Sequence, residues 1–371
     1  MRRLFILSLV AALIAVAPMR SILAEDAASA AGAKHADRAE VVARGVAYFA
    51  KAQAEDGSFS KEAGPAVTAL VAAALINSGQ SPDDPVVARA LEYVLKNVRP
   101  DGGIYSDGSK YKNYETCVSI LCFSAANADN RYDKLLKDAE KFAKGIQWGA
   151  EAGSDPNDPA YGGAGYGGHA RPDLSNTSFL LDALHELDVP ADDPAIQRAL
   201  VFVSRCQNLP SEHNQTKFAD LNPDGGFYYT IAAGGSSPAN STPNGGLRSY
   251  GSMTYAGLKS MIYAGVDKDD QRVKAALEWA KAHYTLEENP GMGAAGVYYY
   301  YQTFAKSLAT LGEDKFVDEA GVEHDWRQEL TDALAARQQA DGSWKNENER
   351  WLESDPNLVT GYALLALSHC E

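Results

Sequence analysis

The stretch whose residue types are best suited to chemistry lies near the middle of the chain, from Tyr161 to Thr177, and reads Y-G-G-A-G-Y-G-G-H-A-R-P-D-L-S-N-T. Its glycines predict a flexible loop that brings polar side chains to the mouth of a central cavity, namely Tyr166, His169, Arg171 and Asp173. A G-x-G-x-x-G pattern occurs within it, but without a preceding strand or a ribose-binding acid, so we reject a dinucleotide site. The simpler interpretation is that Asp173 or Ser175 caps the helix that follows.

Two further acids stand at the start of predicted buried helices. Asp355 lies in S-D-P-N-L-V-T near the C-terminus, and Glu115 lies at the head of an earlier helix. Carboxyl groups around one rim can serve as general acid and base, and Asp173 with Asp355 is the pair that we predict for this role. Three such acids could equally bind a cation or act as helix caps, and Pro356 directly after Asp355 favours a cap.

Aromatic residues are the third chemical feature. The run from Tyr298 to Tyr301, together with Tyr255 and Tyr263, predicts a cavity lined by aromatic rings. Such rings stabilise cations and stack on sugars or prenyl chains. Four successive residues of a helix face all directions, so at most two of the four tyrosines can line the cavity. The predicted ligand-binding set is Tyr166, His169, Glu115, Tyr255, Tyr298 and Trp351.

Helices must position these residues, because apolar side chains recur at helical spacing through most of the chain. The pattern alternates between an amphipathic helix and a helix that is apolar all round, and the latter must be buried on every side. The apolar helices are predicted near 65–76, 114–126, 174–187, 250–264, 297–311 and 355–367. The amphipathic helices that precede them start near 37, 85, 132, 194, 270 and 326.

Internal repetition supports this alternation. The phrases D-P-V-V-A-R-A-L-E-Y-V, D-P-A-I-Q-R-A-L-V-F-V and D-Q-R-V-K-A-A-L-E-W-A open three of the six units. The sequence therefore predicts an all-α protein, a closed double ring of six helical hairpins over residues 37–371. No segment alternates well enough to require a sheet, although 226–232 and 297–301 tolerate short strands.

The turns carry a family resemblance. Q-A-E-D-G-S-F (53–59) and Q-Q-A-D-G-S-W (338–344) resemble the repeat signature of squalene and oxidosqualene cyclases, which the β subunits of protein prenyltransferases share in degenerate form. The turns P-D-G-G-I and P-D-G-G-F look like copies that lack the glutamine. The resemblance covers nearly all of residues 37–371, and it implies an α/α toroid with an isoprenoid-type ligand.

The chemical motifs of these families are incomplete here. The cyclases protonate their substrate with Asp-x-Asp-Asp-Thr, and the nearest match is Asp173 to Thr177, where Ser175 stands in the place of the protonating aspartate. A serine cannot protonate an alkene. The zinc-binding Asp-x-Cys of the prenyltransferases is absent, and we predict neither a metal nor a cofactor.

Three functions follow from these features. The first is an exported terpenoid cyclase-like or prenyltransferase-like protein that binds or transforms an isoprenoid-type apolar ligand. The second is a binding or interaction scaffold that kept the toroid without the chemistry. The third and weakest is a polysaccharide-processing enzyme. A lumen filled by side chains would favour the scaffold, and an open lumen lined with carboxylates and tyrosines would favour sugar chemistry.

The N-terminus predicts export. Residues 1–24 combine Arg2 and Arg3, an apolar run and small residues, which is typical of a cleaved signal peptide, with cleavage as late as residue 30 as the alternative. The run is too short to span a bilayer. A net charge of -15 disfavours a nucleic-acid partner. The four cysteines, of which Cys117 and Cys122 point to different faces of one helix, are expected to be thiols.

Overall fold

The apolar segments of the sequence form helices that are buried on every side. The computed structural model describes residues 35–151, 153–167 and 170–371. Helix α3 (Pro65–Asn77) shows how this arises, since its first eleven residues are all buried. Helix α4 (Pro85–Leu95) precedes the next apolar helix and buries only one stripe: Val87, Ala90, Leu91 and Val94. Periodicity thus assigns each helix to the inside or the outside.

Within the described residues, twelve helices pair into six hairpins. The outer helices are α2 (Arg38–Ala52), α4, α6 (Asp133–Gly145), α8 (Pro194–Arg205), α11 (Gln271–Ala282) and α13 (Trp326–Arg337). The inner helices are α3, α5 (Lys112–Ala125), α7 (Leu174–Glu186), α10 (Gly251–Tyr263), α12 (Val297–Leu311) and α14 (Pro356–Ser368). The predicted alternation of outer and inner helices is confirmed.

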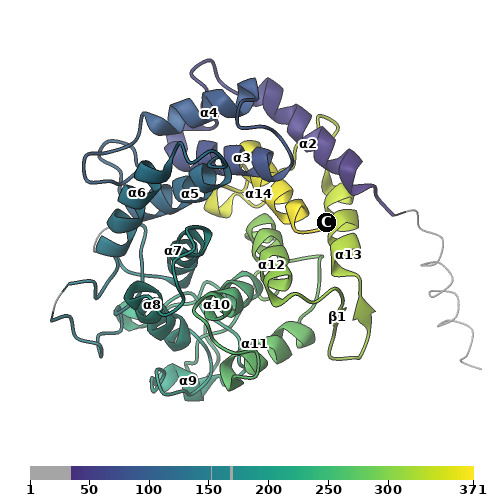
Figure 1. The fold of residues 1–371 in the computed structure, drawn as a ribbon. Helices are drawn as coiled ribbons and strands as arrows, with labels where there is room; N and C mark the ends of the chain where they lie inside the picture. The colour runs from purple at the N-terminus through teal and green to yellow at the C-terminus, as the bar shows by residue number, and fades with distance from the viewer. Residues whose placement is uncertain (1–34, 152, 168–169) are drawn as a thin grey trace, which may run out of the picture. The chain divides into compact units, whose positions relative to one another are not determined.

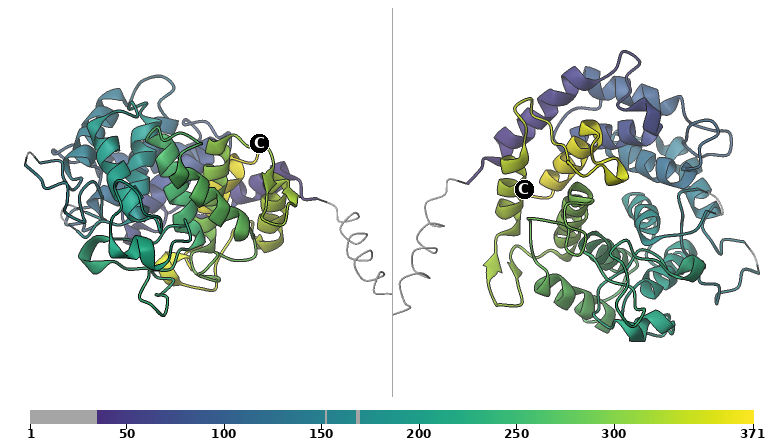
Figure 2. Two further views of the ribbon diagram at one scale, coloured as in Figure 1. Left: turned by 90° about the horizontal axis from the view of Figure 1, so that it is seen from below. Right: turned by 180° about the vertical axis from the view of Figure 1, so that it is seen from behind.

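The unit formed by residues 36–371 is an α/α toroid. Its inner helices contact one another in the order α3, α5, α7, α10, α12, α14, and α14 returns to contact α3. Figure 1 shows these six helices around the centre, with the outer helices outside them. The view from behind in Figure 2 shows the same arrangement. The prediction of a closed double ring of helices is therefore confirmed.

Aspartates begin the outer helices. Asp84 accepts a hydrogen bond from the backbone N–H of Val86, and Asp193 and Asp270 cap α8 and α11 in the same way. Such caps satisfy N–H groups that have no partner within the helix. The repeated D-P and D-Q phrases are therefore helix starts.

The glutamines of the turns join neighbouring hairpins. Gln53 Nε2 donates to the carbonyl oxygen of Gly57 in its own turn at 3.0 Å and to that of Val86 in the next outer helix at 2.8 Å. Gln147 makes the corresponding pair of bonds. Gln338 donates to Val41 at 3.0 Å, which joins the last outer helix to the first. Glutamine side chains therefore join neighbouring outer helices, and Gln338 joins the last outer helix to the first.

The structure corrects two details of the sequence analysis. The fourth hairpin does not lack its glutamine, because Gln207 donates to the carbonyl oxygens of Gly225 and Arg272 across a long connector. The connector holds the short helix α9 (Lys217–Leu221), which separates Gln207 from its turn in sequence. Residues 297–301 are helical, and the paired strands are β1 (Phe316–Val317) and β2 (Glu323–His324). No helix of the described residues is long and apolar enough to cross a membrane.

Candidate functional site

A cavity of about 710 Å³ lies at the N-terminal ends of the inner helices. All six inner helices contribute to its wall through residues of their first two turns, such as Val67 of α3, Met253 of α10 and Leu358 of α14. The volume is within the usual range for small-molecule sites. The lumen is therefore open at this end rather than filled by side chains.

Aromatic rings dominate the cavity wall. The nine that line it are Tyr111, Tyr114, Tyr166, Phe179, Tyr229, Tyr250, Tyr299, Trp351 and Tyr362. Four residues at the mouth expose between 36% and 55% of their surface, namely Tyr111, Tyr166, Trp351 and Leu352. The mouth thus presents apolar surface to solvent, and the wall behind it is lined by tyrosines.

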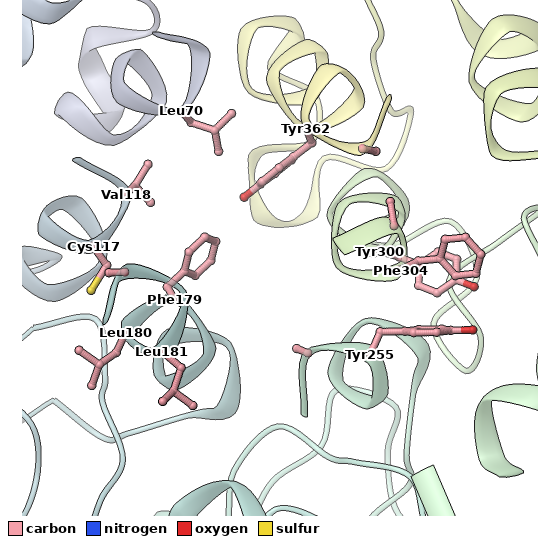
Figure 3. Packing of buried hydrophobic residues seen from close by; sticks show 14 of the residues in the cluster. Leu70, Cys117, Val118, Phe179, Leu180, Leu181, Tyr255, Tyr300, Phe304 and Tyr362 are labelled. Carbon is pink, nitrogen blue, oxygen red and sulfur yellow. The ribbon is translucent and has the colours of Figure 1, made fainter. Parts of the chain in front are cut away.

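Four rings from different inner helices contact one another in this wall. The ring of Phe179 lies 5.1 Å from that of Tyr114 and 6.1 Å from that of Tyr299, which in turn lies 5.8 Å from that of Tyr362. The hydroxyls of Tyr114 and Tyr362 are 3.5 Å apart. Figure 3 shows Phe179 and Tyr362 pointing into the space between the inner helices. Offset and edge-to-face contacts of this kind hold the rings in fixed positions.

A buried cluster of charged residues lies farther along α7, α10 and α12. Lys259 Nζ is 2.5 Å from Asp182 Oδ1, and Lys306 Nζ is 3.2 Å from the same oxygen and 3.4 Å from Glu186. Burial lowers the pKa of Lys259 to about 8, although the Asp182 charge opposes that shift. Sequence analysis missed this cluster. Its signal was present as charged residues within otherwise apolar helices.

Asp173 is the N-cap of α7 and lies behind the cavity wall. Its Oδ1 accepts a hydrogen bond from the backbone N–H of Asn176 at 2.9 Å. The side-chain Nδ2 of Asn176 donates to Oδ1 at 3.1 Å and to Oδ2 at 2.9 Å. The nearby Tyr229 side chain lowers the pKa of this carboxyl. Burial raises the pKa of Asp173 to about 6, and the hydrogen bonds from Asn176 oppose that shift. Asp173 therefore positions Asn176, which does line the cavity.

Glu353, which sequence analysis missed, lines the cavity from the connector before α14. Its Oε1 accepts the backbone N–H groups of Tyr298 and Tyr299 at the start of α12, and its Oε2 accepts Asn346 Nδ2 at 2.6 Å. Burial raises the pKa of Glu353 to about 7. Both carboxylate oxygens are engaged, so Glu353 caps α12 from a distant part of the chain.

Glu115 is a buried carboxyl on the cavity wall, with 2% of its surface exposed. Its Oε2 accepts the backbone N–H of Ser106 at 3.1 Å, and the nearby Ser109 side chain lowers its pKa. Burial raises the pKa of Glu115, and these bonds oppose the shift. Gly64 leaves room for it, because a Cβ at that position would lie 2.3 Å from Glu115 Oε1.

The other predicted residues lie in several places. Tyr166 and Trp351 line the mouth of the cavity. Asp355 caps α14 by accepting the backbone N–H of Asn357 at 2.9 Å, and it is not part of the cavity wall described here. The structure therefore does not bring Asp355 and Asp173 together on that wall.

Two of the predicted tyrosines, Tyr255 and Tyr298, are not part of the cavity wall. Tyr255 lies 5.1 Å from the ring of Phe304, on the side of α10 that faces α12 (Figure 3). Tyr298 packs against Tyr301 at 5.8 Å. His169 lies outside the described residues.

A repeated threonine explains the match to the cyclase motif. Thr177 Oγ1 accepts the backbone N–H of Ala164 at 2.9 Å. The corresponding threonines of other inner helices bond the turn before their helix in the same way, Thr68 to Phe59 and Thr360 to Trp344. The aspartate and threonine of D-L-S-N-T thus have structural roles in the repeat, a cap and a link to the turn.

The described residues contain no group of three or more His, Cys, Asp or Glu side chains arranged to hold a metal ion. The four cysteines are free, and burial raises the pKa of Cys117, Cys122 and Cys206. A buried thiol with a raised pKa is a poor nucleophile, because the reactive form is the thiolate. Among the described residues, the polar groups of the cavity wall are hydroxyls, carboxyls, the Asn176 amide and the Lys110 ammonium.

No protein-family model matches the chain, and no curated protein matches it in sequence. Solved structures do match it in fold. A protein from Actinoplanes is 14% identical, with a TM-score of 0.53 over 90% of this chain and 99% of that one. A polysaccharide lyase is 12% identical, with a TM-score of 0.53 over 90% and 97% of the two chains. A variant of the type II terpene cyclase MstE from Scytonema, in its apo form, is 13% identical, with a TM-score of 0.52 over 90% and 96%. At such identities the likeness shows the fold alone, and the chain has in common with all three the architecture of an α/α toroid.

Proposed function

We propose that the toroid binds an uncharged, mainly apolar ligand of the isoprenoid type in its central cavity. The observation that carries this proposal is the wall of nine aromatic side chains around about 710 Å³. Aromatic rings offer large apolar contact area, and their faces attract positive charge. A branched polyene chain matches the apolar contact area of these rings along its length.

Charge narrows the ligand class. The carboxyl-bearing residues of the wall are Glu62, Asp107, Glu115 and Glu353, whereas Lys110 is its one cationic residue among those described. A diphosphate or a uronic acid chain would be repelled by this set, since like charges near a low-dielectric wall interact strongly. The proposal is therefore restricted to ligands without a phosphate or carboxylate group.

The likeness to the Scytonema type II terpene cyclase supports the proposal, because that chain is matched over 96% of its length by a single toroid. The proposal concerns binding rather than cyclisation through the stretch from Asp173 to Thr177. In that stretch Ser175 bonds the Tyr299 hydroxyl at 2.9 Å, and Asp173 lies behind the wall. We also propose that residues 1–24 are a cleaved signal peptide and that the protein acts after export.

A second candidate ligand is a neutral oligosaccharide. The open lumen lined with tyrosines and carboxyls favours it, as expected above for sugar chemistry, and so do the hydroxyls and stacking rings at the mouth, including Trp351, Tyr111 and Ser109. Sugars stack on such rings and bond such hydroxyls. The likeness to a polysaccharide lyase is consistent with this candidate, although the carboxylates of the wall disfavour a uronic acid chain.

The test is a binding titration with matched variants. Geranylgeraniol is added to the wild-type protein, to Val67→Phe, which fills the cavity, and to Val98→Phe, which changes an exposed residue outside the cavity wall. We expect saturable binding in the wild type and Val98→Phe and at least tenfold weaker binding in Val67→Phe. Saturable binding of a neutral oligosaccharide but not of geranylgeraniol would replace the first candidate with the second.

A further inference from the structure

Residues 346–353 form a closed loop at the mouth of the cavity, which we call the strap. Its two ends are joined, because the backbone N–H of Asn346 donates to the carbonyl oxygen of Glu353 at 2.9 Å and Asn346 Nδ2 donates to Glu353 Oε2 at 2.6 Å. Glu353 Oε1 also accepts the backbone N–H groups of Tyr298 and Tyr299. The base of the strap is therefore attached to the start of α12.

The tip of the strap holds two bulky residues in a backbone conformation that such residues rarely adopt. Trp351 has a φ of 57° and a ψ of 33°, and Leu352 has a φ of 64°. This left-handed region is unfavourable for any residue with a Cβ. Strained residues of this kind persist where the surrounding structure fixes them, and they concentrate at active sites and ligand clamps.

The strap is additional to what a hairpin of this ring needs. The first and sixth hairpins have the same D-G-S-aromatic turn, and in both a threonine of the inner helix accepts the backbone N–H of the aromatic residue. Phe59 and Thr68 are 9 positions apart in the first hairpin, whereas Trp344 and Thr360 are 16 positions apart in the sixth. The longer connector of the sixth hairpin contains the strap, so the strap is not required to link a turn to its helix.

The tip faces the cavity from one side of its mouth. Trp351 and Leu352 both line the cavity, with 41% and 55% of their surface exposed. The other exposed pair at the mouth, Tyr111 and Tyr166, stands before α5 and α7 and makes an edge-to-face contact at 5.3 Å. In the ring, α5 and α7 lie across from α12 and α14 (Figure 1). Two pairs of apolar side chains therefore stand on opposite sides of the mouth.

The ring of Trp351 is held in place by its neighbours. A Cβ at Gly296, directly before α12, would lie 3.0 Å from Cζ3 of this ring. The guanidinium of Arg350 lies 4.4 Å from the ring centroid, a cation–π contact. Glycine at the start of α12 thus leaves room for the tryptophan, and the exposed part of the ring remains open to a ligand.

We propose that the strap retains the ligand: Trp351 and Leu352 contact the part of the ligand nearest the mouth, and Glu353 positions them. This inference rests on the proposed function and adds to it the residues that set the lifetime of the complex. The hydrogen bonds that Glu353 accepts hold the two strained residues beside it in place. Removing its carboxyl should let the tip relax away from the mouth, whereas removing the Trp351 ring should delete the contact itself.

The experiment measures the rate of dissociation. Tritiated geranylgeraniol is bound to the full-length protein, an excess of unlabelled alcohol is added, and the loss of label from the protein is followed. Trp351→Ala, Glu353→Leu and Glu353→Gln are compared with the wild type. Val322→Ala is the control, because it changes an exposed residue outside the cavity wall.

We expect Trp351→Ala to release the alcohol at least about fivefold faster than the wild type, as for the loss of one aromatic contact. Glu353→Leu should act in the same direction, and Glu353→Gln, which keeps an oxygen for the N–H groups of α12, should lie between Glu353→Leu and the wild type. Association rates should change less, since mutations at one site act mainly on dissociation. Thermal unfolding establishes that the Glu353 variants are folded, and the result for Trp351→Ala stands without them.

Fluorescence provides a second measurement of the same contact. All five tryptophans lie within the described residues, and Trp351 alone is exposed. Quenching by acrylamide should therefore report chiefly Trp351 and should decrease when geranylgeraniol binds.

Two results would overturn this inference while leaving the proposed function intact: wild-type dissociation from Trp351→Ala, or quenching that bound alcohol does not reduce. Wild-type dissociation from folded Glu353→Leu would overturn the positioning role of Glu353. Failure of the wild type to bind geranylgeraniol at all would overturn the proposed function and this inference with it.

Discussion

Asn176 Nδ2 lies 2.9 Å from Asp173 Oδ2, and this contact connects the start of α7 with the cavity wall. The carboxylate that sequence analysis selected as a catalytic acid is thereby a support for a neighbour that faces the ligand site. A residue that only positions another can still control binding, because displacement of a contact group by about 1 Å has large effects.

The first prediction concerns the buried carboxyl of Asp173. Burial raises its pKa from 3.8 to about 6, so the folded state holds its proton more tightly than the unfolded state does. Stability should therefore fall as pH rises from about 4 to about 6, by about 3 kcal/mol, and then stay level. Asp173→Asn keeps the cap and removes this dependence. Chemical denaturation at a series of pH values measures it, and parallel profiles for the two proteins would contradict the assignment.

A second prediction tests the closure of the ring. Gln338→Ala removes the bonds to Val41 and Gly342 and leaves both carbonyls without that donor. We expect a loss of about 1–3 kcal/mol in the free energy of unfolding. Gln339→Ala changes the adjacent, exposed glutamine and should alter stability by less than about 0.5 kcal/mol. Urea denaturation compares the two, and an equal effect would remove the special role of Gln338.

The third prediction compares alanine substitutions at two glycines with positive φ, of which only Gly64 lies against Glu115. Gly64 and Gly79 have φ values of +76° and +89°, but a Cβ at Gly79 meets nothing within 4 Å, whereas one at Gly64 meets Glu115 Oε1. Alanine should cost about 1–2 kcal/mol for the positive φ at Gly79 and about 1–3 kcal/mol at Gly64, whose φ of 76° and ψ of −165° lie in a region that is essentially restricted to glycine. Gly64→Ala should in addition weaken ligand binding by displacing Glu115. If Gly79→Ala impaired binding equally, the contact with Glu115 would not be the cause.

A fourth prediction concerns the charges beneath the aromatic wall. Asp182→Asn leaves Lys259 and Lys306 buried without their shared carboxylate, and loss of one partner from a buried ion pair typically costs about 3–5 kcal/mol. Asp138→Asn breaks the exposed pair with Lys134 and should cost less than about 1 kcal/mol. Thermal unfolding distinguishes the two. A small effect for Asp182→Asn would mean that the lysines find other compensation.

The fold was predictable from the sequence because buried positions recur at helical spacing and are occupied by apolar residues. The apolar run from Val297 to Leu311 matches α12 at both ends, and the D-D-P phrases mark helix starts. The hydrogen bond from Gln207 to Gly225 was not predicted, because the inserted connector makes their sequence separation much larger than that of Gln53 and Gly57. The two hydrogen bonds nevertheless join the same pair of groups, a glutamine Nε2 and a glycine carbonyl oxygen.

The site was less predictable than the fold. Glu115, Tyr166 and Trp351 were placed on the wall by their positions near helix starts or turns. Tyr255 and Tyr298 could not be distinguished from lumenal tyrosines, because spacing along one helix does not reveal which neighbour it faces. Glu353 lies in a connector, so its role as a cap for α12 depends on tertiary contacts that no local pattern encodes.

The most direct test of the central claim is to identify what the cavity holds. Protein purified from its native cells is extracted with organic solvent, and the extract is analysed by mass spectrometry beside an extract of Val67→Phe. We expect close to one uncharged isoprenoid-type lipid per wild-type chain and a much smaller amount from the variant. A lipid-free extract from folded wild-type protein, or equal amounts from both proteins, would contradict it.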